Sequence, residues 1–198
     1  RPVESDNKFR QVANSDGGAS RPPNFIIMLT DDQGYNDLGC YGSKLIRTPR
    51  IDSIAEQGVR FTDFYVGSSV CTPSRAALLT GCYPTRISMN AIPGLRDPAD
   101  VLFPDSPHGL NPAEVTLAEL LKGRGYATAC VGKWHLGDAP EFLPTRRGFD
   151  SYFGIPYSND MKPTCLMRDE AVLEPDTNQE LLTERYAEEG VRFIRENR

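Results

Sequence analysis

The segment that decides the fold is 116-TLAELLKGRGYATACVGKWHLG-137, in which the signals for a helix, a strand and a polar motif follow one another. Thr116 and Glu119 form a capping box ahead of an apolar run, and Gly123 ends the predicted helix. Residues 127–131, mostly apolar, then predict a strand. Since helix and strand signals alternate along the chain, the sequence predicts an α/β domain with a largely parallel sheet flanked by helices.

Further elements are predicted on both sides of this segment. Residues 25–29 form a continuous apolar run, which predicts a strand buried on both faces of the sheet. Thr48-Pro49 predicts the start of a helix and Gly58 its end, and residues 59–65 predict another strand. The last residues, 178–198, predict an amphipathic helix. Chemistry in such a sheet is expected beyond the carboxyl ends of the strands.

Composition and organisation exclude several classes of protein. The chain has 22 basic and 27 acidic residues and no basic block, so we expect neither nucleic acid nor an anionic membrane as its partner. No run approaches the roughly 18 apolar residues that span a bilayer. Residues 1–23 are polar and predict a flexible lead, and residues 24–198 are expected to form the folded domain. The five prolines within residues 89–113 are typical of an irregular excursion around a substrate pocket.

The segment 71-CTPSRAALLTG-81 combines a thiol, a cation and a helix start. Pro73 suits the first positions of a helix and Gly81 its end, which alone would allow Cys71 to be a small buried thiol. Helix-start chemistry does not explain Arg75, however. One turn from Cys71, its guanidinium can bind an oxyanion, and the helix N-terminus adds partial positive charge. The segment therefore predicts a site for an anionic substrate.

Lys133 and His135 follow a predicted strand within GKWHLG. In an extended segment alternate residues point to the same side, so both side chains can meet one ligand while Trp134 packs inward. Asp31 and Asp32 follow another predicted strand, and two adjacent carboxylates repel unless a cation or hydrogen-bond donors offset their charge. Taken alone, each pair is more often an ordinary solvated surface feature than a site.

The strings CxPSRxxxLTG and GKWHLG resemble the signature of the type I sulfatases, in which the leading cysteine is oxidised to formylglycine. The segment 154-GIPYS-158 resembles the arylsulfatase A and N-acetylgalactosamine-6-sulfatase group. The resemblance implies an alkaline-phosphatase-like catalytic domain. It implies catalytic roles for Cys71, Arg75, Lys133 and His135, and sulfate binding by Lys133 and Ser158.

The same resemblance implies a Ca²⁺ or Mg²⁺ ion bound by Asp31, Asp32 and the converted Cys71, whereas Asp37 is expected only to orient the turn. Five cysteines without a CxxC pair give no support for a zinc or thioredoxin-like site. If Cys71 is converted, the other four could form two disulfides, although Cys130 lies in an apolar run and is more simply a buried free thiol.

The implied function is hydrolysis of aryl or carbohydrate sulfate esters, after maturation by a formylglycine-generating enzyme and export to a periplasm, lysosome or medium. Sulfatases place further metal ligands, a histidine and a lysine beyond the region matched here. We therefore expect this chain to be the N-terminal portion of a catalytic domain, with a trimmed start at Arg1 and weak or absent activity by itself. The alternatives are a phosphonate or phosphodiester hydrolase of the same superfamily and a non-catalytic fragment that binds sulfated glycans.

Overall fold

The computed structural model describes residues 22–90 and 101–198. The chain divides into two compact units, Arg1–Thr62 (unit 1) and Asp63–Arg198 (unit 2), each of which is described by itself. The predicted flexible lead, residues 1–23, lies outside the described residues except for its last two positions.

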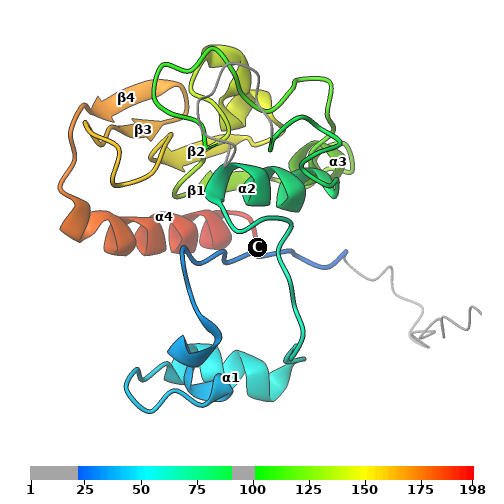
Figure 1. The fold of residues 1–198 in the computed structure, drawn as a ribbon, viewed down its shortest axis with the longest axis vertical. Helices are drawn as coiled ribbons and strands as arrows, with labels where there is room; N and C mark the ends of the chain where they lie inside the picture. The colour runs from blue at the N-terminus through cyan, green and yellow to red at the C-terminus, as the bar shows by residue number, and fades with distance from the viewer. Residues whose placement is uncertain (1–21, 91–100) are drawn as a thin grey trace, which may run out of the picture. The chain divides into compact units, whose positions relative to one another are not determined.

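Unit 1 is built on a short helix and two 3-10 turns (Figure 1). The elements are η1 (Tyr35–Asp37), η2 (Gly39–Tyr41) and α1 (Pro49–Gln57). The Thr48 hydroxyl accepts a hydrogen bond from the Gly39 amide at 2.8 Å and donates one to Asp52 Oδ1 at 2.9 Å. The Cys40 amide also donates to Asp52 Oδ1, at 2.7 Å. The first turn of α1 therefore holds η2 in place, and the predicted start and end of this helix are confirmed.

Two predicted strands are absent from the described residues. Residues 25–29 have no regular structure, and their side chains are 44% to 71% exposed. Residues 59–65 are also irregular, with Val59, Phe61 and Phe64 exposed. An apolar run becomes a strand only when a neighbouring strand satisfies its backbone groups, and no described strand pairs with either segment. These two predictions were wrong because the sequence shows the apolar run and not its partner.

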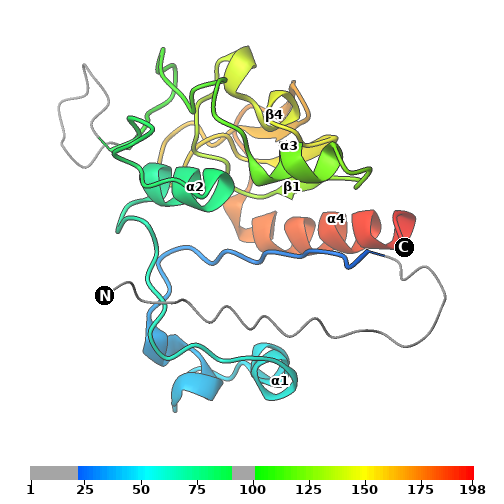
Figure 2. The same ribbon diagram turned by 90° about the vertical axis from the view of Figure 1, so that its right-hand side faces the viewer.

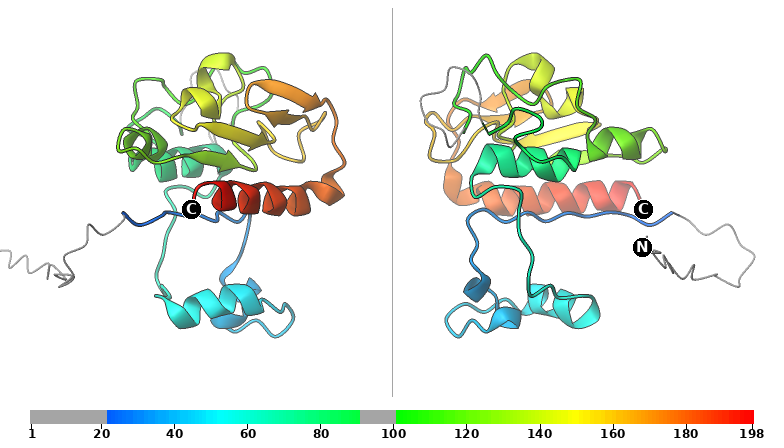
Figure 3. Two further views of the ribbon diagram at one scale, coloured as in Figure 1. Left: turned by 180° about the vertical axis from the view of Figure 1, so that it is seen from behind. Right: turned by 45° about the vertical axis from the view of Figure 1, so that its right-hand side comes forward.

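Unit 2 holds a four-stranded sheet in the order β1-β2-β3-β4 (Figure 3). Its elements are α2 (Cys71–Thr80), α3 (Leu117–Lys122), β1 (Ala129–Val131), η3 (Pro140–Phe142), η4 (Pro144–Arg146), β2 (Ser151–Gly154), β3 (Leu166–Arg168), β4 (Ala171–Glu174), η5 (Gln179–Leu181) and α4 (Leu182–Glu196). The α/β class is confirmed. In the described part the sheet is mixed rather than largely parallel, because only β1 and β2 run parallel. The tight turn between β3 and β4 allows only antiparallel pairing.

Alternate residues of the strands point into two separate cores. On one face, α4 packs along β1 and β2 (Figures 1 and 2), and the buried cluster consists of Phe153, Ile155, Leu166 and Leu182, with Val131 and Tyr186 against it. On the other face, Tyr152 and Met167 join Ala76 of α2 and the buried Trp134. The sheet is therefore covered on both sides, as expected for an α/β domain.

The local signals around the sheet are confirmed in detail. Thr116 Oγ1 accepts from the Glu119 amide at 3.1 Å, and the Glu119 carboxylate accepts from the Thr116 amide at 2.7 Å, which is the predicted capping box. The predicted helix over 178–198 begins later, at Leu182, because the Asn178 side chain caps the 3-10 turn η5 instead. None of the described helices combines the length and apolar character needed to cross a membrane.

Candidate active site

The site is positioned by a parallel pair of segments that continues past the end of β1. The Gly132 amide donates to Phe153 O at 2.8 Å, the Trp134 amide to Ile155 O at 3.0 Å, and the His135 amide to Pro156 O at 2.9 Å. The hydrogen bonds between β1 and β2 thus continue into the segments that follow them, GKWHLG and GIPYS. Lys133 and Ser158 consequently follow the carboxyl ends of neighbouring parallel strands. The sequence predicted this position for Lys133 but indicated no strand before Ser158.

Lys133 contacts three of the other predicted site residues. Its Nζ lies 3.1 Å from Cys71 Sγ and 3.1 Å from Ser158 Oγ. Its backbone carbonyl accepts a hydrogen bond of 2.6 Å from Arg75 Nη1. Cys71 is the first residue of α2, whose other end is closed by Gly81 at φ 67. Four of the side chains singled out in the sequence, those of Cys71, Arg75, Lys133 and Ser158, therefore belong to one connected group, and their roles remain predictions.

Trp134 and His135 are both buried. Trp134 is 2% exposed and donates from Nε1 to Phe142 O at 3.0 Å, so its predicted packing role is confirmed. His135 is 0% exposed, and its φ of 63 shows that strict alternation does not hold at this residue. His135 Nε2 lies 2.8 Å from Leu102 O. Because a carbonyl oxygen can only accept, Nε2 carries a hydrogen, and Nδ1 is the nitrogen that can accept a proton.

Two further residues near the motifs, Tyr157 and Asp160, have shifted pKa values that the sequence did not predict. The pKa of Asp160 is lowered by a hydrogen bond from the Ser158 side chain and by its backbone environment, and the charges of Lys133 and His135 add to this effect. Burial raises the pKa of Tyr157, and the neighbouring Asp138 carboxylate raises it further. Asp160 stands two residues after the predicted sulfate-binding serine, and no local pattern distinguishes it from an ordinary turn residue.

The predicted metal ligands Asp31 and Asp32 are exposed side chains of unit 1. Asp32 has φ 51, a left-handed conformation that aspartate tolerates. The Asp37 carboxylate accepts from the Gly34 amide at 2.7 Å and so orients the turn, as expected. Among the described residues no group of three or more His, Cys, Asp or Glu side chains is arranged to hold a metal ion. The two carboxylates are the hard oxygen donors that suit Ca²⁺ or Mg²⁺, and they would supply part of a coordination shell.

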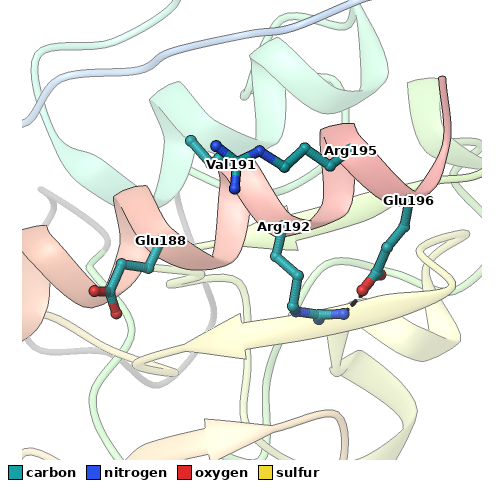
Figure 4. A pocket seen from close by; sticks show the side chains of 5 residues that line it. All are labelled: Glu188, Val191, Arg192, Arg195 and Glu196. Carbon is teal, nitrogen blue, oxygen red and sulfur yellow. Dashed lines mark hydrogen bonds and ion pairs between the residues drawn. The ribbon is translucent and has the colours of Figure 1, made fainter.

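Two surface hollows of the described residues lie away from these motifs. One, of about 360 Å³, lies on α4 between Glu188, Val191, Arg192, Arg195 and Glu196 (Figure 4). Another, of about 230 Å³, is lined by residues 86–89 with His108, Gly109, Asn111 and Glu114. The second hollow includes part of the excursion 89–113, of which residues 91–100 lie outside the described part. A substrate pocket formed by this excursion remains a prediction.

The cysteines are free thiols in the structure. Cys130 packs against the core beside Tyr152 and Trp134, and burial raises the pKa of its thiol to about 12. A thiol with so high a pKa is not a nucleophile at neutral pH. The expectation of an unpaired, structural Cys130 is therefore confirmed.

Residues 23–198 match the family model described as Sulfatase. Arylsulfatase A of Homo sapiens is 54% identical over 146 residues, covering 73% of this chain and 27% of that protein. N-acetylgalactosamine-6-sulfatase of Sus scrofa is 38% identical over 200 residues, covering 90% of this chain and 37% of that protein. Among solved structures, PsFucS1 sulfatase from Pseudoalteromonas sp. superposes with a TM-score of 0.75 at 28% identity, covering 89% of this chain and 41% of that one.

These matches confirm the resemblance read from the motifs and the expected fold. The chain spans about a quarter to 37% of the length of the curated relatives it matches. This coverage agrees with the expectation that the chain is a portion of a longer catalytic domain.

Proposed function

The chain belongs to the sulfatase family, and from this premise we propose that the whole protein hydrolyses sulfate esters at an aldehyde made from Cys71. The observation that carries the proposal is the position of Lys133 Nζ, 3.1 Å from both Cys71 Sγ and Ser158 Oγ. Cys71 Sγ stands in here for the oxygen atoms of the modified side chain. A cation, a hydroxyl and the reacting position thus meet at the N-terminus of α2, where an anion is favoured.

The modified Cys71, once hydrated, would supply a hydroxyl whose oxygen attacks sulfur and displaces the ester's alcohol. Loss of the proton from the second hydroxyl would then reform the aldehyde and break the bond to sulfate, which leaves. The residues of this chain would do the binding and the proton transfer. Lys133 binds a sulfate oxygen through Nζ, and Ser158 orients it with its hydroxyl. Arg75 holds the backbone of Lys133 and adds positive charge beside the nucleophile. His135 accepts a proton at Nδ1, because its Nε2 is committed to Leu102 O.

The carboxylates of Asp31 and Asp32 would hold a divalent cation, Ca²⁺ or Mg²⁺. When bound, such an ion would withdraw charge from the reacting oxygen atoms. The support for this assignment is the donor type of the two side chains.

Relatives differ in what their names say they act on: arylsulfatase A and N-acetylgalactosamine-6-sulfatase imply an aryl sulfate and a saccharide sulfate. For this protein we propose the shared class, a sulfate ester of an aryl or carbohydrate alcohol. Maturation would require a formylglycine-generating enzyme, and we propose that the protein is exported.

The test uses the full-length protein expressed with a formylglycine-generating system. We expect turnover of p-nitrophenyl sulfate and loss of turnover in a Cys71→Ala variant that keeps the far-UV circular dichroism of the wild type. An aldehyde-reactive probe should label the Cys71 peptide of the wild type only. Preference for bis-p-nitrophenyl phosphate would instead assign a phosphodiester hydrolase. Binding of a sulfated glycan without turnover by the converted protein would assign a non-catalytic binding protein.

A further inference from the structure

Thr72, which occupies the variable second position of CxPSR, has a fully buried side chain that no motif reading singles out. It is 0% exposed, although it directly follows the half-buried Cys71 at the start of α2. Its hydroxyl donates to His135 O at 3.0 Å and accepts from the Leu102 amide at 3.2 Å. One hydroxyl group thus joins three segments that are 30 or more residues apart in sequence.

The hydrogen bonds of Thr72 are part of a closed ring. Leu102 donates its amide to Thr72, and its carbonyl oxygen lies 2.8 Å from His135 Nε2. His135 in turn accepts the Thr72 hydroxyl at its own backbone carbonyl. All three residues are 0% exposed, so no bulk water can replace a lost partner. Three buried hydrogen bonds that close a ring in this way resist rotation of any one member.

The ring joins the nucleophile to the proton acceptor. Thr72 is covalently next to Cys71, and Leu102 fixes which nitrogen of His135 carries the hydrogen. Loss of the hydroxyl would remove the hydrogen bond to the His135 carbonyl and the acceptor of the Leu102 amide, and so would loosen the residue whose carbonyl holds the imidazole.

We propose that Thr72 is a positioning residue of the sulfatase reaction, which acts through Leu102 and His135 to hold the imidazole at a fixed distance from the modified Cys71. This role rests on the proposed function. It differs from a purely structural role because it concerns the chemical step. Misplacement of a catalytic group by about 1 Å can reduce turnover about 100-fold.

The test compares three variants of the full-length converted enzyme. Thr72→Val removes the hydroxyl and keeps the shape, whereas Thr72→Ser keeps the hydroxyl. Thr116→Val is the matched control: Thr116 is also 0% exposed, and its hydroxyl likewise donates once, to Arg147 O at 2.9 Å, and accepts once, from the Glu119 amide at 3.1 Å. Mass spectrometry of the Cys71 peptide normalises each rate to the converted fraction.

We expect Thr72→Val to reduce kcat at least about tenfold with KM within about twofold, and Thr72→Ser to restore kcat to within about threefold of the wild type. Thr116→Val should lose comparable thermal stability and keep kcat within about twofold. Hydrogen exchange should show the Leu102 amide opening at least about tenfold faster in Thr72→Val only.

Wild-type kcat in Thr72→Val would overturn the proposal, as would an equal loss of kcat in Thr116→Val, since stability alone would then explain the effect. A Leu102 amide that exchanges at the wild-type rate in Thr72→Val would remove its geometric basis. If the wild type itself fails to hydrolyse the sulfate ester, the proposed function fails and the positioning role fails with it. Hydrogen exchange distinguishes this result from a failure of the positioning role alone, because it measures the hydrogen bond of Leu102 without turnover.

Discussion

Replacement of Lys133 by methionine is the most direct test of the contact group at the start of α2. Methionine keeps the length of the side chain and removes its charge. In the structure Nζ lies 3.1 Å from both Cys71 Sγ and Ser158 Oγ, so a sulfate group bound at Cys71 would meet this ammonium group directly. A charged hydrogen bond contributes about 1.5 to 3 kcal/mol, and the partial burial of Lys133 favours the upper half of that range.

A loss of about 2 to 3 kcal/mol of transition-state binding corresponds to a decrease of roughly 30- to 160-fold in kcat/KM. The assay is initial-rate hydrolysis of p-nitrophenyl sulfate by the full-length converted enzyme at low ionic strength. Ser158→Ala removes a neutral partner and should cost only about 1 kcal/mol, or about fivefold. Lys44→Met, at an exposed lysine of unit 1, is the control for the change in net charge.

The reasoning would be refuted by a Lys133→Met enzyme within about threefold of the wild type at equal aldehyde content. It would also be refuted if Lys44→Met lowered kcat/KM as much, because the effect would then be one of overall charge rather than of contact.

Three further predictions concern stability and the metal. Gly154→Ala should destabilise the protein by about 1 to 3 kcal/mol in urea unfolding, because its methyl group would overlap a neighbouring backbone carbonyl, whereas Gly190→Ala, with open space around it, should not. Hydrogen bonds from Arg168 and Arg192 lower the pKa of Glu189 to about 2. The ionised Glu189 therefore stabilises the folded protein above the ordinary glutamate pKa, and this stabilisation is lost as the pH falls toward 2. Glu189→Gln should therefore lower the free energy of unfolding by about 1 to 2 kcal/mol at pH 7, a value reduced because both arginines are partly exposed. The loss should become progressively smaller below pH 4.5. A difference in unfolding free energy between wild type and variant that does not change with pH would contradict this prediction. EDTA should abolish turnover and added Ca²⁺ or Mg²⁺ restore it, and full activity after chelation would exclude the carboxylate metal site.

The sequence predicted best those elements whose cause is local. The capping box at Thr116 and Glu119 acts within one turn of helix, and Gly81 adopts the left-handed conformation that ends α2. The contacts of Lys133 could be anticipated because its motif follows a strand, and parallel neighbours bring such ends together.

The remaining features depend on partners distant in sequence. The apolar residues 25–29 read as a strand, but the described residues provide no strand to pair with them. The antiparallel pairing of β2 with β3 depends on how the chain returns to the sheet, which periodicity does not encode. Thr72 occupies the variable position of its motif, and only the folded chain brings its hydroxyl to Leu102 and His135.

The exposed run Phe25-Ile26-Ile27-Met28-Leu29 has a practical consequence for handling the chain. It is uncharged and contains no proline, and its side chains are 44% to 71% exposed. Segments of this composition readily form intermolecular cross-β contacts. Concentrated solutions of the isolated chain should therefore aggregate through these residues, and a lysine or a proline introduced within them should improve its solubility.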